Sequence, residues 1–373
     1  MKIGIDCRMY STSFTGIGRY VFELISYLEK NDTKNEYVLF FNEPHFSLYN
    51  CTNSNFKKVL VGARHYSFAE QTIFLYKLYK EKLDLMHFTH FNAPIFYFRP
   101  SVVTIHDLTL SFYPGKKMTN ILHRLAYGIT IKSITRKAKK IIAVSKHTKK
   151  DIIEALNISE DKIVVIYEGI NKNDFHKIED KSEIDKIKLK YNIKNNYILY
   201  VGVLREHKNI LRLVKSYGEL LKEGINFDLV IIGKEDYTTF DVRNAIIEQN
   251  IKKNVHLLGY IPDKELNIFY SGALAFVFPS LYEGFGLPIL ESMVLGIPVA
   301  CSNLSSLPEV AGQDGAVYFN PLSIESIKQS IKEITENESL RQNLIKNGYK
   351  RIDLFSWEKM GKKILEIYTN LKI

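Results

Sequence analysis

The chain has 373 residues, 51 Lys and Arg against 41 Asp and Glu, a formal net charge of +10 and 46% hydrophobic residues. This length is too great for one ordinary core and suits two domains, and the ordinary charged, glycine and proline content excludes a disordered or collagen-like chain. No apolar run reaches the roughly 18–20 residues of a membrane span, and the first residues lack the apolar stretch of a signal peptide.

The cysteines carry no sign of a structural role. Cys7, Cys51 and Cys301 are odd in number, lie far apart and form no CxxC pair. Neither a disulfide framework nor a zinc site is therefore indicated. Together with the lack of a signal peptide, this predicts a cytoplasmic, enzyme-sized protein.

Short β-branched and aliphatic runs alternate with longer amphipathic segments in the first half of the chain. The runs predict strands, and the amphipathic segments, such as 18–28 and 68–81, predict helices. The strands expected here are 2–6, 37–41, 58–61, 85–88, 101–105, 140–144 and 163–166.

The same alternation begins again in the second half. Strand–helix alternation is typical of parallel sheets with right-handed crossovers, so the predicted fold class is α/β with two doubly wound, Rossmann-like domains. Ligands of such sheets bind at the carboxyl ends of the strands. The expected strands are 197–201, 227–232, 255–257, 274–278, 299–300 and 316–319, with helices at 208–222, 239–250, 287–296 and 323–335.

Composition marks the expected domain boundaries. Residues 171–190 are rich in charge and poor in apolar side chains, which indicates a linker or a boundary helix. We therefore expect one domain at 1–172 and a second at 173–354. Residues 355–371 carry apolar side chains at helical spacing, so a terminal amphipathic helix within 355–373 should dock on a domain.

Positive charge is concentrated in the first half of the chain. Residues 1–180 hold 26 basic and 18 acidic residues, and 108–150 alone hold 11 basic residues and no acidic one. Such a field attracts phosphates, anionic lipid headgroups or nucleic acid, but a solvated helix face explains it equally well. The stretch matches no nucleic-acid-binding motif, so we expect no nucleic-acid partner.

The segment 278–291 reads Phe-Pro-Ser-Leu-Tyr-Glu-Gly-Phe-Gly-Leu-Pro-Ile-Leu-Glu and carries the strongest chemical signal. It predicts a strand end, a glycine-bearing loop and a helix, because Pro288 suits a first helical turn. Backbone N–H groups of residues 284–287 should then present an anion site at the helix N-terminus. Glu283 and Glu291 bracket the loop. One interpretation is that they bind sugar or ribose hydroxyls, and the other is that Glu283 is only a turn residue and Glu291 only a helix-start residue. The presence of two carboxylates around this loop favours the first interpretation.

This segment closely resembles the signature of the family-4 retaining glycosyltransferases, which have the GT-B fold. The resemblance extends in order over essentially the whole chain, and it is specific to the family but not to donor or acceptor. The further matching motifs are Thr15-Gly16-Ile17-Gly18-Arg19-Tyr20, Thr104-Ile105-His106-Asp107-Leu108, Ala143-Val144-Ser145, Tyr200-Val201-Gly202 through Lys208-Asn209, and Gly259-Tyr260-Ile261-Pro262.

The resemblance implies that the two domains face each other across a cleft, with the nucleotide sugar on the C-terminal domain and the acceptor on the N-terminal one. The terminal helix would cross back onto the N-terminal domain. Glu283 would contact donor-sugar hydroxyls and Glu291 the ribose, and Tyr260 and Ile261 would form the nucleobase wall with Leu266 beneath. The other donor-binding positions implied are Gly16, Gly18, Gly202, Gly284, Phe285, Gly286 and Leu287.

Lys208 follows the strand 197–201 and its loop, where a cation can neutralise a diphosphate. A surface lysine at a helix start is the alternative, although the helix dipole would slightly disfavour it. Many relatives place Arg directly before this Lys, but this chain has His207 there. Arg205 is therefore the candidate second cation, and whether Arg205 or His207 reaches the phosphate is open.

His106 follows the strand 101–105 at the edge of the sheet. A histidine there is often only a hydrogen-bonded structural residue, but the resemblance places it near the reacting sugar and the acceptor, with Asp107 as a support residue or turn former. His87 and His90 are spaced for metal binding, yet no third ligand is apparent. We treat them as cleft-wall or core residues and expect no metal and no cofactor.

Three further residues have open roles. Arg19 is either a helix-face residue or an acceptor contact, and Ser145 caps the helix that follows it or lies on the acceptor side. Glu309 is a weaker candidate, since a capping role explains it as well.

The expected reaction moves a hexose from a nucleoside-diphosphate sugar to a hydroxyl with retention. Lys208, Arg205 and the helix N-terminus would stabilise the charge on the leaving phosphate. A front-face substitution needs no protein nucleophile, so neither glutamate is assigned the acid or nucleophile role of a glycosidase. Whether the reaction is front-face or a double displacement is open.

The motif variants look most like mannosyl- and rhamnosyltransferases of bacterial polysaccharide and O-antigen synthesis. GDP-mannose is therefore the first expected donor and a UDP-sugar the second, with a glycan or polyprenyl-diphosphate-linked glycan as acceptor. The stretch 108–150 would rest on the anionic inner face of a membrane. The alternatives are a nucleotide-sugar 2-epimerase, which the motif order fits poorly, and a non-catalytic nucleotide-sugar-binding partner.

Overall fold

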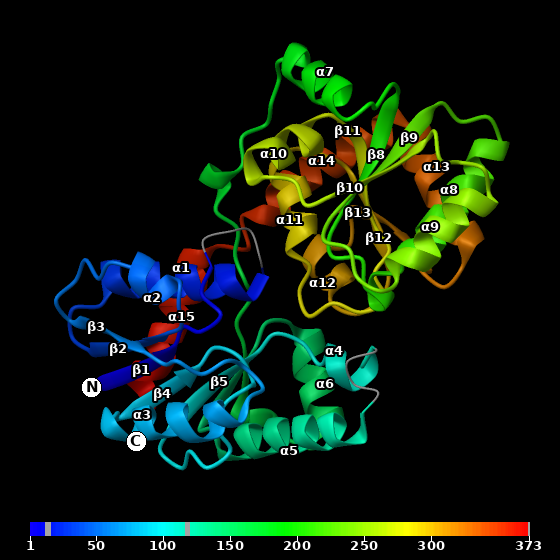
Figure 1. Cartoon of the computed structure of the whole chain (residues 1–373). Helices are drawn as coiled ribbons and strands as arrows, with labels where there is room; N and C mark the ends of the chain where they lie inside the picture. The colour runs from blue at the N-terminus through cyan, green and yellow to red at the C-terminus, as the bar shows by residue number, and fades with distance from the viewer. Residues whose placement is uncertain (12–15, 116–119, 372–373) are drawn as a thin grey trace. The chain divides into compact units, whose positions relative to one another are not determined.

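The computed structural model describes residues 1–11, 16–115 and 120–371, and its chain forms two compact units (Figure 1). Unit 1 consists of Met1–Gly169 together with Trp357–Ile373, and unit 2 of Ile170–Ser356. Thr15, Lys116 and Lys117, which the sequence motifs and the basic stretch include, lie outside the described residues.

The described strands of unit 1 form one parallel sheet in the order β3-β2-β1-β4-β5-β6-β7. Its strands are β1 (Lys2–Asp6), β2 (Glu36–Phe41), β3 (Phe56–Leu60), β4 (Leu85–Phe88), β5 (Ser101–Ile105), β6 (Lys140–Ala143) and β7 (Ile163–Val165). Its helical segments are α1 (Gly16–Asn31), α2 (His45–Leu48), η1 (Glu70–Phe74), α3 (Leu75–Lys80), α4 (Thr109–Phe112), α5 (Ile121–Lys137), α6 (Lys146–Leu156), η3 (Glu160–Lys162) and α15 (Trp357–Asn370).

Both faces of this sheet are buried, as expected for a parallel sheet covered by helices. Met86 and Phe88 of β4 belong to the apolar cluster that includes residues of α3, α5 and α6. His87, between them in β4, belongs to the opposite face, where its Nδ1 lies 2.5 Å from the Tyr368 hydroxyl of α15. Burial lowers the pKa of His87 to about 3, with a smaller contribution from His106, so the neutral ring is a core residue as predicted.

The terminal helix α15 belongs to unit 1, where it packs against α1 (Figure 1). The contact is close, because a Cβ atom at Gly361 would lie 2.3 Å from Cγ of Tyr27. Met360, Ile364 and Tyr368 form its buried stripe, which is the amphipathic pattern visible in the sequence.

Unit 2 repeats the architecture with a parallel sheet whose described strands run β10-β9-β8-β11-β12-β13. The strands are β8 (Asn196–Val201), β9 (Phe227–Ile232), β10 (Val255–Gly259), β11 (Ala273–Phe278), β12 (Val299–Ser302) and β13 (Ala316–Phe319). The helical segments are η4 (Lys172–Asp174), α7 (Lys181–Lys190), η5 (Glu206–Lys208), α8 (Ile210–Lys222), α9 (Thr239–Glu248), α10 (Asp263–Ser271), α11 (Leu287–Val294), α12 (Leu307–Ala311), α13 (Ile324–Glu336) and α14 (Glu338–Ile352).

Strand order reverses between β1 and β4 in unit 1 and between β8 and β11 in unit 2. In open parallel sheets, ligands bind at such switch points, outside the carboxyl ends of the strands. The loops that leave these four strands are therefore the places where each unit should hold its ligand.

One helix prediction needs correction, and for a second segment the structure shows which of two predicted alternatives forms. The helix expected at 208–222 begins at Ile210, because Lys208 ends the 3₁₀ turn η5 and Asn209 adopts a left-handed conformation with φ of 61°. The segment 171–190, predicted as a linker or a boundary helix, forms η4 and then α7, whose first turn Asp180 caps by accepting from the Ser182 N–H.

Candidate active site

Two glycines bring the chain close together at the carboxyl ends of β8 and β9. Gly202 has φ of +154° and Gly233 has φ of +153°. A Cβ atom on Gly233 would lie 1.9 Å from the Gly202 carbonyl oxygen, so glycine is required for this approach. The loop after β8 is thereby held beside the loop after β9 on the edge where a ligand of unit 2 should bind.

The loop after β11 leads into α11 through Gly286, whose φ of +111° again suits glycine. Pro288 lies in the first turn of α11, as the sequence predicted. Pro288 has no N–H, and the Ile289 N–H donates to the Gly286 carbonyl at 3.1 Å, so the remaining N–H groups of the first turn and the helix dipole are what favour an anion here. Phe285 is buried beneath this turn, where its ring packs edge-on against Phe355.

Glu283 and Lys208 meet across the switch point of unit 2. Lys208 Nζ donates to Glu283 Oε1 at 2.6 Å, and both side chains are mostly buried. Lys208 also lies 5.6 Å from the centroid of the Phe278 ring. The cation expected to bind a diphosphate and the carboxylate expected to bind a sugar therefore neutralise each other in this structure.

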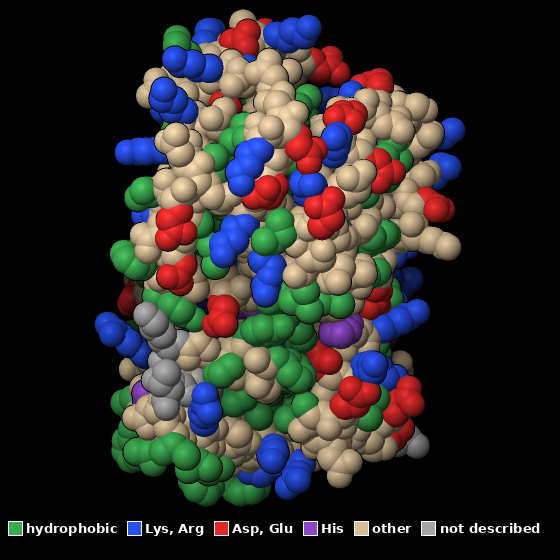
Figure 2. All heavy atoms as spheres, turned by 90° about the vertical axis from the view of Figure 1, so that its right-hand side faces the viewer, with side chains coloured by type: hydrophobic (Ala, Val, Ile, Leu, Met, Phe, Trp, Pro, Cys, Tyr) green, Lys and Arg blue, Asp and Glu red, His purple; other side chains and the backbone are tan. Residues whose placement is uncertain are grey.

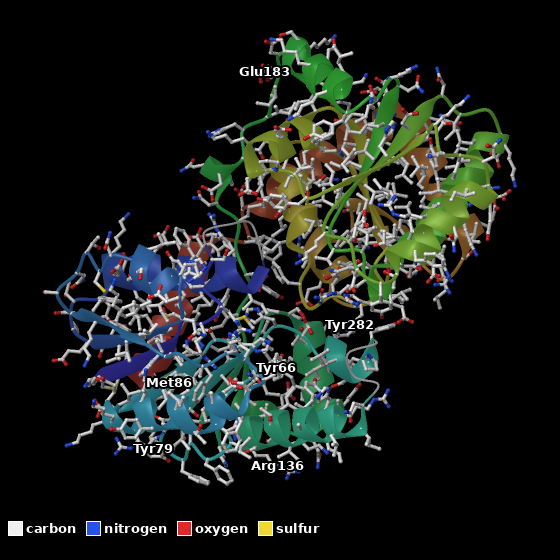
Figure 3. All side chains as sticks on the ribbon, in the orientation of Figure 1. Tyr66, Tyr79, Met86, Arg136, Glu183 and Tyr282 are labelled. Carbon is white, nitrogen blue, oxygen red and sulfur yellow. The ribbon has the colours of Figure 1, made fainter. Side chains whose placement is uncertain are left out.

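The backbone of Glu283 is held by two serines that the sequence reasoning missed. Ser305 Oγ accepts from the Glu283 N–H at 2.8 Å, and Ser306 Oγ lies 3.0 Å from the Glu283 carbonyl oxygen and 2.8 Å from that of Phe285. The hydrogen bonds of Ser305 and Ser306 fix the loop that carries the two-glutamate motif. The position of this loop can be found in Figure 3 from Tyr282, the residue just before Glu283.

Glu291 lies in α11, and its Oε2 accepts a hydrogen bond of 2.9 Å from the Tyr270 hydroxyl of α10. Burial, and then the Glu291 charge, raise the pKa of Tyr270 well above its ordinary value, so this phenol stays a donor at neutral pH. Sequence reasoning missed Tyr270, because it predicted no helix where α10 (Asp263–Ser271) precedes β11.

Two buried hydroxyls near this loop have no partner within the described part of the chain, namely Tyr200 Oη at the end of β8 and Ser280 Oγ after β11. Burial, and then the charge of Glu283, raise the pKa of Tyr200 well above its usual range. Native proteins satisfy most buried hydroxyls. Tyr200 belongs to β8 and Ser280 follows β11, so both orphan groups lie on the two strands, or the loop after them, at the switch point of unit 2.

The other donor-side candidates are more scattered. Arg205 Nε lies 3.5 Å from Asp236 Oδ2 with its side chain 54% exposed, whereas His207 is buried. Tyr260 is 72% exposed, while Ile261 and Leu266 are buried in unit 2. Arg205 is thus the one of the two cation candidates with an accessible charge, though it points to Asp236.

In unit 1, His106 follows β5 and is buried, with hydrogen-bond partners on both ring nitrogens. Nδ1 lies 2.9 Å from Glu168 Oε1 and Nε2 lies 3.0 Å from the Thr89 carbonyl oxygen. A carbonyl only accepts, so Nε2 donates to Thr89, while Nδ1 faces the Glu168 carboxylate. Sequence reasoning missed Glu168, which follows β7 at the same edge of the sheet.

The acceptor-side candidates of unit 1 have structural partners as well. Asp107 Oδ1 accepts from the Thr109 N–H at 2.7 Å, and Ser145 Oγ caps α6 by accepting from the Thr148 N–H at 3.0 Å, as predicted. Arg19 pairs with Glu23 at 2.6 Å along α1. Gly16 opens α1, and Gly18 is buried in it.

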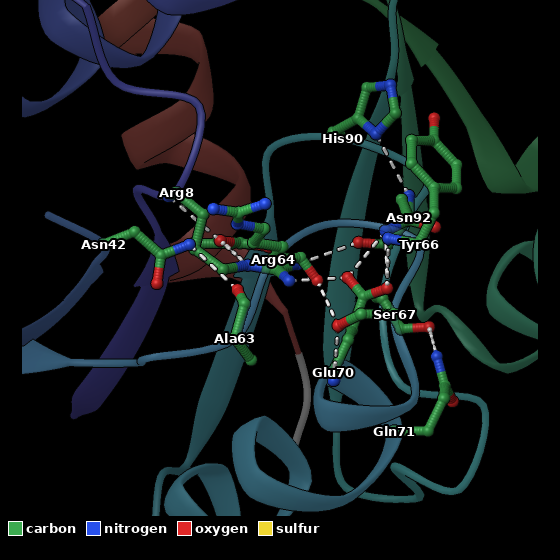
Figure 4. Close-up of polar contacts among 12 residues, drawn as sticks. Arg8, Asn42, Ala63, Arg64, Tyr66, Ser67, Glu70, Gln71, His90 and Asn92 are labelled. Carbon is green, nitrogen blue, oxygen red and sulfur yellow. Dashed lines mark hydrogen bonds and ion pairs between the residues drawn. The ribbon is translucent and has the colours of Figure 1, made fainter.

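A buried ion network lies at the switch point of unit 1 (Figure 4). Arg8, just after β1, donates to Asp6 Oδ2 at 2.7 Å and to Glu70 Oε1 at 2.5 Å, with its side chain fully buried. Asn92, after β4, donates to both Glu70 oxygens at 2.6 Å. Sequence reasoning missed this network, because its members come from three distant segments.

Among the described residues, no group of three or more His, Cys, Asp or Glu is arranged to hold a metal ion. Within these residues, no helix is long and apolar enough to span a membrane.

Two Rossmann-like units with parallel sheets define the class of this protein as GT-B. Among solved structures, sucrose-phosphate synthase from Thermosynechococcus elongatus superposes with a TM-score of 0.76 at 19% identity, covering 99% of this chain and 98% of that one. WaaG, a glycosyltransferase involved in lipopolysaccharide biosynthesis, superposes with a TM-score of 0.73 at 15% identity over 99% of this chain and 100% of that one.

Sequence comparisons then place the chain in a family. The model described as "Glycosyl transferases group 1" matches 181–351, and "Glycosyltransferase Family 4" matches 14–174. The chain is 28% identical to O-antigen chain mannosyltransferase B of Escherichia coli over 100% of both proteins. It is 31% identical to O-antigen chain mannosyltransferase RfbU of Salmonella typhimurium over 66% of this chain and 64% of that protein.

The chain therefore belongs to the family-4 glycosyltransferases of group 1 and is a hexosyltransferase. The predicted α/β fold class and the family resemblance are confirmed.

Proposed function

We propose that this enzyme transfers a mannosyl residue from GDP-mannose to a hydroxyl of a lipid-linked glycan in the synthesis of a bacterial O-antigen or related polysaccharide, with retention at the anomeric carbon. The observation that carries the proposal is the full-length similarity to an O-antigen chain mannosyltransferase. Partial similarity to serotype-specific mannosyltransferase WbdA of Escherichia coli, 29% over 63% of this chain, supports the same sugar.

The donor would bind at the switch point of unit 2. Its diphosphate would face Lys208 and the N-terminus of α11, and its ribose hydroxyls would replace or share the Tyr270 bond to Glu291, since a carboxylate accepts from paired hydroxyls. The 2.6 Å bond between Lys208 and Glu283 would then open. Lys208 would move to the diphosphate and Glu283 would accept from mannose hydroxyls.

In the reaction, the bond from the anomeric carbon to the diphosphate oxygen breaks and a bond to the acceptor oxygen forms on the same face. The acceptor proton passes to the leaving diphosphate. Lys208 and the backbone N–H groups of α11 would stabilise the negative charge that builds on that diphosphate. No protein nucleophile is needed, which agrees with a Glu283 that accepts from mannose hydroxyls in the donor complex.

Lipid-linked acceptors would be met at a membrane surface, and unit 1 carries a fitting face. In the first half of α5, Ile121, Leu122, Leu125 and Ile129 are 71%, 67%, 56% and 57% exposed. Figure 2 shows this side of the molecule, with apolar side chains gathered along its lower edge and Lys and Arg among them. The basic residues of 108–150 would add about 1 kcal/mol each at an anionic surface.

A donor panel tests the proposed reaction. Purified enzyme is incubated with a polyprenyl-diphosphate-linked or synthetic mannoside acceptor and with GDP-mannose, UDP-glucose, UDP-galactose or dTDP-rhamnose, and the product linkage is read by mass spectrometry and NMR. We expect transfer from GDP-mannose, giving an α-mannoside. If only a UDP-sugar supports transfer, the donor is a UDP-sugar and not GDP-mannose. We include UDP-sugars because a structural relative, Anabaena HepE, has a structure with bound UDP-glucose. Turnover of the donor to a 2-epimer, or binding without any turnover, would contradict the proposal.

Vesicle flotation tests the membrane part separately. We expect binding to vesicles with 30% phosphatidylserine at low salt, weakened by salt because exposed charges are screened, and none to phosphatidylcholine vesicles. L122E on α5 should reduce flotation, whereas F240E on α9, where Phe240 is 69% exposed, should not. If L122E floats with the vesicles as well as F240E does, α5 is not the membrane contact.

A further inference from the structure

Tyr66 of unit 1 has an unusual conformation for an exposed aromatic residue. Its side chain is 59% exposed, and its φ is +59°, in the left-handed region that residues other than glycine rarely adopt. Such strain persists only where the surrounding structure holds it, and it concentrates at functional sites. Figure 3 labels Tyr66, which comes from the segment between β3 and η1.

The buried ion network holds Tyr66 in this conformation. The Tyr66 N–H donates to Glu70 Oε2 at 3.1 Å, and Glu70, 1% exposed, is fixed by Arg8 and Asn92 (Figure 4). Ser67 tightens the same turn, since its Oγ donates to the Arg64 carbonyl at 2.6 Å. A buried network of charged and polar groups therefore holds one exposed ring in place. Supporting interactions of this kind preorganise a binding residue.

Other aromatic rings pack behind Tyr66. Its ring lies 6.3 Å from that of Phe91, a buried core residue, which packs edge-on against Tyr127 at 5.3 Å. The Tyr127 hydroxyl is 2.8 Å from Ser111 Oγ, and Asp107 lies within electrostatic range of Tyr66. The group combines flat apolar faces with hydroxyl and carboxylate groups.

His65, next to Tyr66, adds an unsatisfied polar group. Both of its ring nitrogens are buried and make no hydrogen bond of ordinary geometry with the described residues, although a weaker contact with the Arg8 backbone acts on its pKa. Burial, and then the Arg8 charge, lower the pKa of His65, and burial with neighbouring histidines lowers that of His90 well below its usual value. Neutral imidazoles can donate to one hydroxyl and accept from another.

We propose that His65 and Tyr66, at the switch point between β1 and β4, form the subsite that binds the sugar ring of the acceptor. The pyranose would lie against the exposed Tyr66 ring, and its hydroxyls would bind the His65 nitrogens once the His65 side chain turns outward from its buried position. The inference rests on the proposed glycosyl transfer for its biological role, but the site itself binds a glycoside without the donor.

The test first measures binding with no donor present. Saturation-transfer NMR is recorded with the methyl α-glycosides of mannose, rhamnose, galactose, glucose and N-acetylglucosamine, and with methyl α-mannobioside. At least one should bind the native enzyme, and Y66G should lose that signal at least 10-fold. Y66G also removes the need for a left-handed tyrosine, so its thermal midpoint should be equal or higher. Y66F should retain binding.

H65F separates a ligand-binding histidine from a structural one. It keeps a ring of similar size but removes both unpaired nitrogens, so we expect weaker glycoside binding, a higher acceptor KM, an unchanged affinity for GDP and no loss of thermal stability. The matched control is Y76A, because Tyr76 on α3 is also 65% exposed, and it should match the native enzyme.

The outcomes separate the two proposals. If the native enzyme binds none of the glycosides, or if Y66G and H65F keep native binding and acceptor KM, the subsite is wrong even when mannosyl transfer occurs. If glycoside binding depends on Tyr66 but no donor supports transfer, the subsite stands and the proposed reaction is wrong.

Discussion

The ion pair between Lys208 and Glu283 makes an unusual prediction, namely that removing an active-site carboxylate should tighten nucleotide binding. Lys208 Nζ and Glu283 Oε1 are 2.6 Å apart, and their side chains are 18% and 12% exposed. In the proposed mechanism, a diphosphate has to displace Glu283 from Lys208. E283Q would therefore release the cation before the ligand arrives, at the same time as it removes a mannose contact.

The size of the effect follows from the geometry. Exposed ion pairs contribute about 0–1 kcal/mol, and hydrogen bonds to charged groups about 1.5–3 kcal/mol. A pair of this limited exposure should lie between them, at about 1–2 kcal/mol, which corresponds to roughly 5–30-fold tighter binding of GDP. K208M should weaken GDP binding by about 10–100-fold, since it removes a charge-assisted contact.

Calorimetric titration of GDP into the native enzyme, E283Q and K208M measures these affinities, and a transfer assay accompanies it. We expect E283Q to bind GDP more tightly and yet to lose transfer. E265Q is the matched control, because Glu265 pairs with Lys190 at 2.7 Å elsewhere on unit 2 and should change neither quantity. Weaker binding of GDP by E283Q would refute the idea that the Glu283 carboxylate and the diphosphate of GDP compete for Lys208.

Three further predictions concern folding. G233A should lower the free energy of unfolding by more than G224A does. Both variants suffer about 1 kcal/mol of backbone strain, but of the two only the new Cβ at Gly233 meets a carbonyl oxygen, at 1.9 Å, while Gly224 faces open space. Equal thermal midpoints of the two variants would contradict this. Burial alone would raise the pKa of Asp228, but hydrogen bonds from His256 and other side chains lower it below its ordinary value of 3.8. The charged carboxylate therefore stabilises the fold above that ordinary pKa, and this contribution is lost as pH falls through the folded pKa. Urea unfolding should show the native and D228N proteins converging in stability below about pH 4. Y368F should lower the unfolding free energy of unit 1 by about 1–2 kcal/mol, because the buried His87 of β4 loses one of its two hydrogen-bond partners and keeps only Thr104. An unchanged urea midpoint would count against the bond to Tyr368.

Local patterns were sufficient for the strands and for the two-glutamate loop. The runs at 2–6, 85–88 and 101–105 coincide with β1, β4 and β5, because buried parallel strands are continuous apolar runs that need no knowledge of the rest of the chain. The start of α11 followed from Pro288 and Gly286 for the same local reason.

The partners of the candidate residues could not be predicted in this way. Glu168 meets His106 across 62 positions of sequence, and Tyr270 meets Glu291 only because α10 and α11 flank β11. Glu70 looked like an ordinary charge on an amphipathic segment, yet it is 1% exposed. Its burial depends on Arg8 and Asn92, which the sheet brings together, so no local pattern could separate it from a surface glutamate.

The place of α15 has a consequence for how the protein is made. Its Tyr368 lies in the core of unit 1, against His87, although residues 170–356 of unit 2 separate it from the rest of that unit. A ribosome moving along the message delivers all of unit 2 before it delivers this helix, so the unit that begins first is the one completed last. Until then, the face of α1 around Tyr27 that will receive Gly361 is open, and a nascent chain paused after residue 356 would present it to chaperones beside a unit 2 that is already whole.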